Sequence, residues 1–165
     1  MTSPTLVASS AVRQPDDSST MNMRSLKFNA WSRMNFTDKI HIIRSGLPPQ
    51  RLGELAKIMG IPNNVLIGML GLSQATINYK VKQKLPLSPE ETERLIGLES
   101  LLGQVEAMAD TASVPQFNAA QWLASWLTVS LPALGNATPG SFMDTMEGQK
   151  HVSNLLEMAQ SGAYA

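Results

Sequence analysis

The sequence has 165 residues and no cysteine, and its 13 Lys and Arg residues balance its 13 Asp and Glu residues to a formal net charge of zero. The lack of cysteine excludes disulfides, cysteine-ligated metal sites and a thiol nucleophile. A hydrophobic fraction of 43% predicts a globular chain that can bury a core. No apolar run is long enough to span a membrane, and the first residues lack the features of a secretory signal. We therefore expect a cytoplasmic protein.

The zero net charge conceals an uneven distribution along the chain. Residues 1–36 carry four basic and two acidic residues, whereas residues 37–84, the basic segment, carry seven basic and two acidic residues. Residues 85–165, the acidic segment, carry two basic and nine acidic residues. This asymmetry predicts two surfaces with different partners, nucleic acid for one and protein for the other. Two ordinary solvated faces would give the same counts.

Residues 1–36 are predicted to form a mobile arm. Their first part is rich in Ser, Thr, Pro and Asp and has no apolar periodicity. The short stretch from Leu26 to Trp31 does not distinguish between a lone strand and a turn.

The basic segment is predicted to form four short helices, because its apolar residues recur at intervals of three and four. Thr37 is the expected N-cap of the first helix, which should turn Ile40 and Ile43 toward the core. Pro48 and Pro62 are expected to open the second and third helices.

The third and fourth helices have the pattern of a helix-turn-helix unit. Gly71 allows the positive φ of the turn and precedes the inward residue Ile77 by six positions. Ser73 is the expected N-cap of the fourth helix, and Val81 is expected to point inward with Ile77. The N-cap, the outward side chains and the lysines that follow form the predicted DNA-binding site, which consists of Ser73, Gln74, Thr76, Asn78, Lys80, Lys82 and Lys84.

These residue types suit the recognition of double-stranded DNA. The amides of Gln74 and Asn78 match the edge of adenine, and the hydroxyl of Thr76 can contact several bases. The lysines can neutralise phosphates, and Ser73 at the helix N-terminus can add a phosphate contact. Ile67 is larger than the Ala usual at its position in such units and would push the two helices apart. The alternative is therefore a plain helical hairpin with a solvated lysine face.

The helix-turn-helix domain is predicted to span residues 37–86, and a second helical domain to span residues 87–165. Ser88 begins a capping box for a long helix, and Asn118 is the expected N-cap of another. A turn-rich stretch then leads to a closing helix. Since nothing alternates with a period of two over a useful length, the fold is predicted to be all-α.

No catalytic or metal site is predicted. His41 and His151 are the only histidines and have no partner at a ligand spacing. No phosphate-binding glycine loop and no nucleophile-elbow sequence is present. The glutamates that follow Ser88 lie where they favour the helix dipole. We therefore expect a protein that is not an enzyme and binds no cofactor.

Several ordered motifs resemble a known family. They are Leu131-Pro-Ala-Leu-Gly135, then Met143-Asp-Thr-Met-Glu-Gly148, and the ending Gly162-Ala-Tyr-Ala165. Together they resemble the toxin-binding domain of the Xre/MbcA/ParS antitoxins. Upstream, Gly46-Leu-Pro48 and the capping box also match this family, so the resemblance covers residues 37–165.

This resemblance implies a type II antitoxin with two activities. Its C-terminal half would bind and inhibit a RES-domain toxin that degrades NAD, and its helix-turn-helix would bind operator DNA and repress the shared operon. The resemblance also implies a homodimer or a higher assembly with the toxin.

The chain end offers a route to inhibition. Gly162 can end the last helix in the left-handed conformation, and we hypothesise that the ring of Tyr164 and the terminal carboxylate then block the NAD site of the toxin. The toxin-binding residues predicted on this basis are Leu156, Gly162, Ala163, Tyr164 and Ala165. The alternative is a frayed terminus.

Trp122 and Trp126 lie one helical turn apart. We expect one of them in the core and the other in a dimer or toxin contact. Two other functions remain open at this point. One is a free-standing helix-turn-helix regulator, which would lack a neighbouring toxin gene, and the other is an interaction adaptor, which would not bind DNA.

Overall fold

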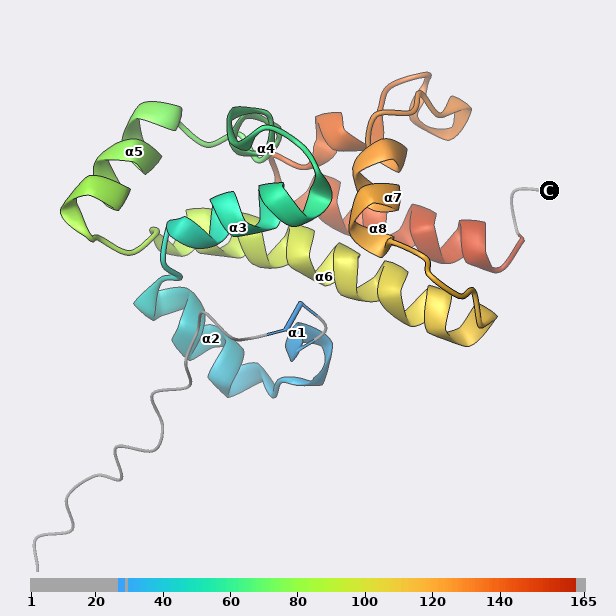
Figure 1. The fold of residues 1–165 in the computed structure, drawn as a ribbon, viewed down its shortest axis with the longest axis horizontal. Helices are drawn as coiled ribbons and strands as arrows, with labels where there is room; N and C mark the ends of the chain where they lie inside the picture. The colour runs from blue at the N-terminus through green and yellow to red at the C-terminus, as the bar shows by residue number, and fades with distance from the viewer. Residues whose placement is uncertain (1–26, 29, 163–165) are drawn as a thin grey trace, which may run out of the picture.

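The long helix α6 (Pro89–Ala112) runs through the centre of the molecule, and the other helices pack around it (Figure 1). The computed structural model describes residues 27–28 and 30–162, and these residues form helices and no strand, as predicted. The elements before α6 are α1 (Ala30–Arg33), α2 (Phe36–Ser45), α3 (Gln50–Met59), α4 (Asn63–Met69) and α5 (Gln74–Gln83). After it come α7 (Ala119–Trp126), the 3-10 turns η2 (Pro132–Leu134) and η3 (Pro139–Phe142), and α8 (Met146–Gln160).

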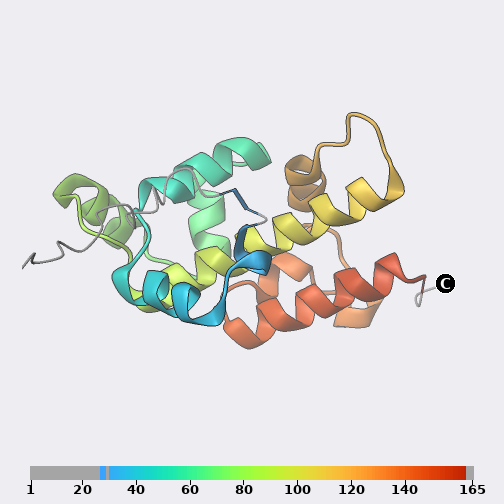
Figure 2. The same ribbon diagram turned by 90° about the horizontal axis from the view of Figure 1, so that it is seen from below.

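The helices form two layers around α6. Seen from below, α3 and α7 lie on one side of α6, whereas α2 and α8 lie on the other (Figure 2). One continuous apolar cluster fills the space between them, with Leu95, Leu98 and Leu102 of α6 fully buried at its centre. Burial of one such leucine contributes about 1.5–3 kcal/mol to stability. Because helices from both halves of the chain pack on α6, these leucines form a core that the two halves share.

The predicted N-caps after residue 70 are confirmed. Ser73 accepts a hydrogen bond from the backbone N–H of Thr76, and Asn118 accepts one from that of Gln121. Ser88 and Glu91 form the complete capping box at the start of α6. These helix starts depend on residues three positions apart, which is why the sequence reveals them.

The prediction for the first helix is wrong in its start and incomplete in its inward face. Asn35, rather than Thr37, is the N-cap of α2, since its side chain accepts from the backbone N–H of Asp38. Ile42 is the buried residue of this helix, at 6% exposed, whereas Ile40 and Ile43 are half-buried, and Ile43 packs against the core as predicted. Because three of the four residues from 40 to 43 are isoleucines, the sequence alone does not show which of them faces inward. The packing of α2 against α6 decides it.

Most of the predicted N-terminal arm lies outside the described residues. Residues 30–33, however, form α1, and Trp31 is buried at 2% exposed, so the helical fold begins before residue 37. Four residues cannot form a stable helix alone. A contact with α6, made by Trp31, holds this turn in place.

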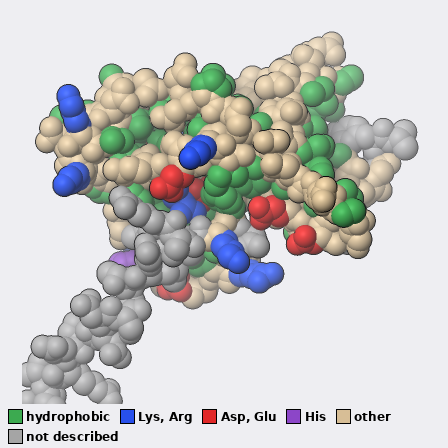
Figure 3. Space-filling view, viewed as in Figure 1, with side chains coloured by type: hydrophobic (Ala, Val, Ile, Leu, Met, Phe, Trp, Pro, Cys, Tyr) green, Lys and Arg blue, Asp and Glu red, His purple; other side chains and the backbone are tan. Residues whose placement is uncertain are grey.

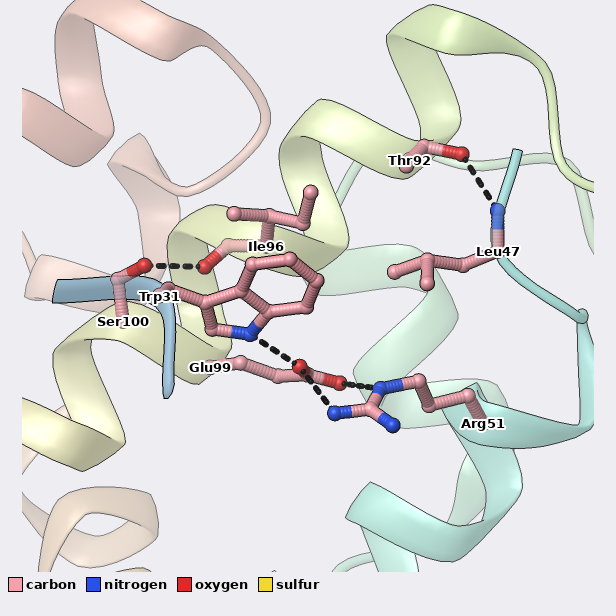
Figure 4. A network of polar contacts seen from close by, with 7 residues as sticks. All are labelled: Trp31, Leu47, Arg51, Thr92, Ile96, Glu99 and Ser100. Carbon is pink, nitrogen blue, oxygen red and sulfur yellow. Dashed lines mark hydrogen bonds and ion pairs between the residues drawn. The ribbon is translucent and has the colours of Figure 1, made fainter. Parts of the chain in front are cut away.

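A buried ion pair anchors α1 and α3 to α6 (Figure 4). The guanidinium of Arg51 donates to both carboxylate oxygens of Glu99, with N–O distances of 2.5 and 2.8 Å. The indole N–H of Trp31 donates to the same carboxylate at 2.7 Å. Burial raises the pKa of Glu99, while the hydrogen bonds from Arg51 and Trp31 act in the opposite direction. The rings of Phe28 and Trp31 lie 5.7 and 5.9 Å from the guanidinium carbon.

Candidate functional site

Helix α5 protrudes from one end of the molecule (Figure 1). Ile77 is its one buried residue, and α4 is the helix against which it packs. Gly71 has the predicted positive φ, 64°, in the turn between them. Ile67 is 1% exposed and is part of the core. Helices α4 and α5 therefore have the predicted helix-turn-helix arrangement, with most of the surface of α5 open to solvent.

Val81 is the exception among the predicted inward residues of α5. Its side chain is 40% exposed, although it lies one turn after Ile77 on the same stripe. The stripe is uncovered at this point because α5 extends beyond the helix that it packs against.

The predicted DNA-binding residues gather on the outer side of α5 and at its two ends. Thr76, Asn78, Lys82 and Lys84 are exposed, and Figure 3 shows basic side chains at this end of the molecule. The amide nitrogen of Gln74 donates to the amide oxygen of Asn78 at 3.0 Å. This bond fixes the two amides relative to each other on the outer side of α5.

Lys80 differs from the other predicted phosphate contacts, because its ammonium group forms an ion pair with Glu91. The same carboxylate accepts from the backbone N–H of Ser88 at 2.7 Å. Partial burial acts to raise the pKa of Glu91, but the hydrogen bonds from Lys80 and Ser88 outweigh it, and the pKa is lowered overall. The ammonium group of Lys80 is therefore already paired, and this ion pair links α5 to the start of α6.

The turn before α5 also touches the acidic segment. Arg94 of α6 donates to the backbone carbonyls of Leu70 and Gly71 at 3.3 and 3.1 Å. A Cβ on Gly71 would lie 2.8 Å from the Cβ of Asp144, which precedes α8. The helix-turn-helix therefore packs directly against the loop that begins the C-terminal helix.

The motifs after α7 build a compact support for α8. Met143 is fully buried, and the side-chain amide of Gln149 donates to its carbonyl at 2.9 Å and to that of Arg94 at 3.0 Å. Gly148 has no room for a side chain, because a Cβ would overlap the carbonyl oxygen of Phe142. These motif residues thus hold the fold together.

Two of the predicted toxin-binding residues are described, Leu156 in the last turns of α8 and Gly162 just after this helix. Gly162 has a φ of 71°, the left-handed conformation that the sequence predicts. Ala163, Tyr164 and Ala165 lie outside the described residues. Leu156 is 1% exposed, so its side chain belongs to the core and reaches a partner only from the floor of a groove.

The two tryptophans of α7 stack on each other, with ring centroids 6.1 Å apart and planes 11° apart. Trp126 is half-buried and packs against the core, whereas Trp122 is 40% exposed. The structure thus identifies Trp126 as the core residue of the pair and Trp122 as the surface residue.

Within residues 27–28 and 30–162, no group of three or more His, Asp or Glu side chains could hold a metal ion. No helix among these residues is long and apolar enough to cross a membrane.

Comparisons with known proteins match both halves of the chain. Residues 38–99 match the antitoxin Xre-like helix-turn-helix domain, and residues 116–162 match the antitoxin Xre/MbcA/ParS C-terminal toxin-binding domain. A "Prs ADP-ribosylating antitoxin" of Sphingobium sp. (strain YBL2) is 39% identical over 139 residues, which cover 84% of this chain and 87% of that protein. Neither matched domain is an enzyme domain. The chain therefore belongs to the Xre/MbcA/ParS antitoxins, which are components of toxin–antitoxin systems.

Proposed function

We propose that this antitoxin neutralises an NAD-consuming toxin of the RES class through its C-terminal half, and represses its own operon through α5. The observation that carries the proposal is the match of residues 116–162 to a toxin-binding domain. Helix α5 and the end of α8 lie at opposite ends of the molecule (Figure 1), so one chain can engage DNA and toxin together. We place this activity in the cytoplasm, where operator DNA is found.

The tail is the part that we propose enters the NAD site. Deleting residues 162–165 is expected to abolish protection in an assay of NAD loss with purified toxin. Gly162 follows Ser161, the C-cap of α8, and has the left-handed φ that commonly terminates a helix. Retention of operator binding by the truncated chain controls for folding. Full neutralisation by this truncated chain would refute a plug made by the tail.

The name of the Sphingobium relative refers to ADP-ribosylation of Prs. It favours a toxin that cleaves the bond between nicotinamide and ribose and transfers the ADP-ribose to a protein, over one that transfers it to water. With NAD labelled in its adenylate part, a transferase places the label on protein, whereas a hydrolase leaves it in free ADP-ribose. We propose that the toxin is the transferase. A toxin that degrades NAD, as the family resemblance implies, is the second candidate.

The DNA-binding half is proposed to act as a homodimer, with half-sites about 34 Å apart. Lys82 and Lys84 of each protomer would contact phosphates, because Lys80 is held by Glu91. Four such contacts give a slope of about −3.6 for log K against log salt concentration. Glu91→Gln keeps a capping box but frees Lys80, so we expect tighter binding and a slope of about −5.4.

An electrophoretic shift titration over salt concentration measures both slopes. Glu90→Gln is the matched control, since Glu90 is exposed on the same turn and the ion pair of Lys80 is formed with Glu91 instead. Equal slopes for the Glu91→Gln variant and the unmodified chain would show that the freed Lys80 adds no phosphate contact. The absence of any shift at low salt would instead favour the interaction adaptor.

A further inference from the structure

An apolar groove lies where the C-terminal half of α6, the start of α7 and the last turns of α8 meet. Its volume is about 340 Å³. Met108 and Ala112 of α6 form one wall, Phe117 and Trp122 form a second, and Ala159 of α8 forms a third, with Leu156 at the floor. Such a groove can accept one or two large apolar side chains from another molecule.

The second wall is a row of aromatic rings that solvent still reaches. Phe117 and Trp122 are 36% and 40% exposed, and their ring centroids lie 6.2 Å apart. Trp122 in turn stacks on the half-buried Trp126, which fixes its position against the core. Rigid, partly exposed aromatic side chains beside a pocket are the residues that most often dominate a protein interface.

The surroundings of the groove are acidic. Asp110 and Glu157 are exposed and directly follow the groove residues Ala109 and Leu156, and Glu106 is half-buried and interacts electrostatically with Asp110. Residues 95–149 contain no Lys, Arg or His. Figure 3 shows hydrophobic side chains at this end of the molecule. A partner that fits this surface presents a large apolar side chain flanked by basic residues.

We propose that this groove is the primary docking site of the toxin, an inference that rests on the function proposed above. The matched toxin-binding segment supplies two of its walls, through Phe117, Trp122 and α8. The remaining wall, formed by Met108 and Ala112, comes from α6, which lies outside that segment, so the toxin-contact surface extends onto the central helix. The apolar side chain of the toxin inserts between Trp122 and Ala159, and its basic neighbours face Asp110 and Glu157.

The position of the groove also explains how a short tail can act. Gln160 lines the groove, and Gly162 is the last described residue after it. Residues 163–165 span at most about 10 Å when extended. A plug made by these residues reaches an active site only if the toxin is seated close to the end of α8. Docking in the groove places it there.

The test uses the full-length antitoxin and its purified toxin, with affinity measured by isothermal titration calorimetry. Trp122→Ala is expected to weaken toxin binding by about 30-fold or more, because it removes the exposed aromatic wall. Ala159→Arg fills the mouth of the groove from an exposed helix position and is expected to weaken binding to a similar degree. Phe36→Ala is the matched control, because Phe36 is 79% exposed and lies outside the groove.

Operator binding by each variant shows that it is folded, since α5 lies at the other end of the molecule. Deletion of residues 162–165 is expected to keep most of the affinity while losing neutralisation, which separates docking from plugging. Wild-type affinity for both groove variants would overturn the groove proposal alone. No binding by the unmodified antitoxin would overturn the proposed function. A change from dimer to monomer in the groove variants, with unchanged toxin affinity, would assign the groove to a second copy.

Discussion

Replacing Arg51 with alanine is expected to destabilise the protein by about 3–5 kcal/mol, because the carboxylate of Glu99 is then buried without its counter-charge. Both side chains are almost fully buried, at 3% and 0% exposed. A loss of this size is comparable to the whole stability of many domains. Urea denaturation with the midpoint and slope fitted together measures the change.

The pH dependence of the Arg51→Ala variant follows from the same carboxylate. Burial raises the pKa of Glu99, and loss of the guanidinium removes a group that opposes this rise. A raised pKa in the folded state means that the folded protein gains stability as the pH falls and loses it as the pH rises. The deficit of the variant is therefore expected to shrink in mild acid.

A double substitution separates loss of the pair from loss of packing. Arg51→Met combined with Glu99→Leu removes both charges and keeps apolar volume but leaves the indole N–H of Trp31 without its acceptor, so it is expected to cost about 1–3 kcal/mol, less than Arg51→Ala. A double variant as unstable as Arg51→Ala would contradict the account based on an uncompensated charge.

Gly148→Ala is expected to destabilise the fold by about 2–3 kcal/mol. An added Cβ would overlap the backbone carbonyl oxygen of Phe142 and lie 2.9 Å from the hydroxyl of Thr145, which caps α8. A backbone carbonyl cannot rotate away as a long side chain can, so the start of α8 itself must shift.

Gly68→Ala is the control for this substitution. Gly68 also lies within a helix, α4, and no atom lies within 4 Å of its added Cβ. The same chemical change is expected to stabilise the protein by about 0.5–1 kcal/mol at this position. Thermal unfolding of the two variants measures whether each substitution raises or lowers the stability. A stabilised Gly148→Ala variant would contradict the close approach to Phe142.

The sequence predicts best what short stretches of chain decide. Ser73, Ser88 and Asn118 begin their helices through bonds to backbone N–H groups three positions ahead. Gly71 and Gly162 adopt the left-handed conformation that their places at helix ends suggest. Helix content and helix order follow from such signals together with apolar spacing.

Contacts between distant segments explain what the sequence does not predict. Helix α1 depends on the bond from Trp31 to Glu99, which are 68 positions apart. The ion pairs of Arg51 with Glu99 and of Lys80 with Glu91 join the basic and acidic segments. Part of the charge asymmetry along the chain is therefore neutralised within the fold and is not available to partners.

The polar surface of α5 and the apolar groove near Trp122 differ in how far the sequence predicts them. The polar side chains of α5 are predictable from the sequence of this one helix, because a protruding helix exposes nearly all of its side chains. The groove near Trp122 is formed by three elements that are distant in sequence, and spacing alone does not bring them together. The exposed aromatic pair of Phe117 and Trp122 is the signal that points to it.

The central position of α6 limits how specificity can be exchanged between related antitoxins. A chimera that joins the operator-reading part of one protein to the toxin-contacting part of another must choose a parent for this helix. Its N-terminal half holds the turn before α5 through Arg94, and its C-terminal half forms a wall of the groove through Met108. With the operator and toxin contacts proposed above, new pairings of operator and toxin therefore require compatible surfaces on both halves of α6.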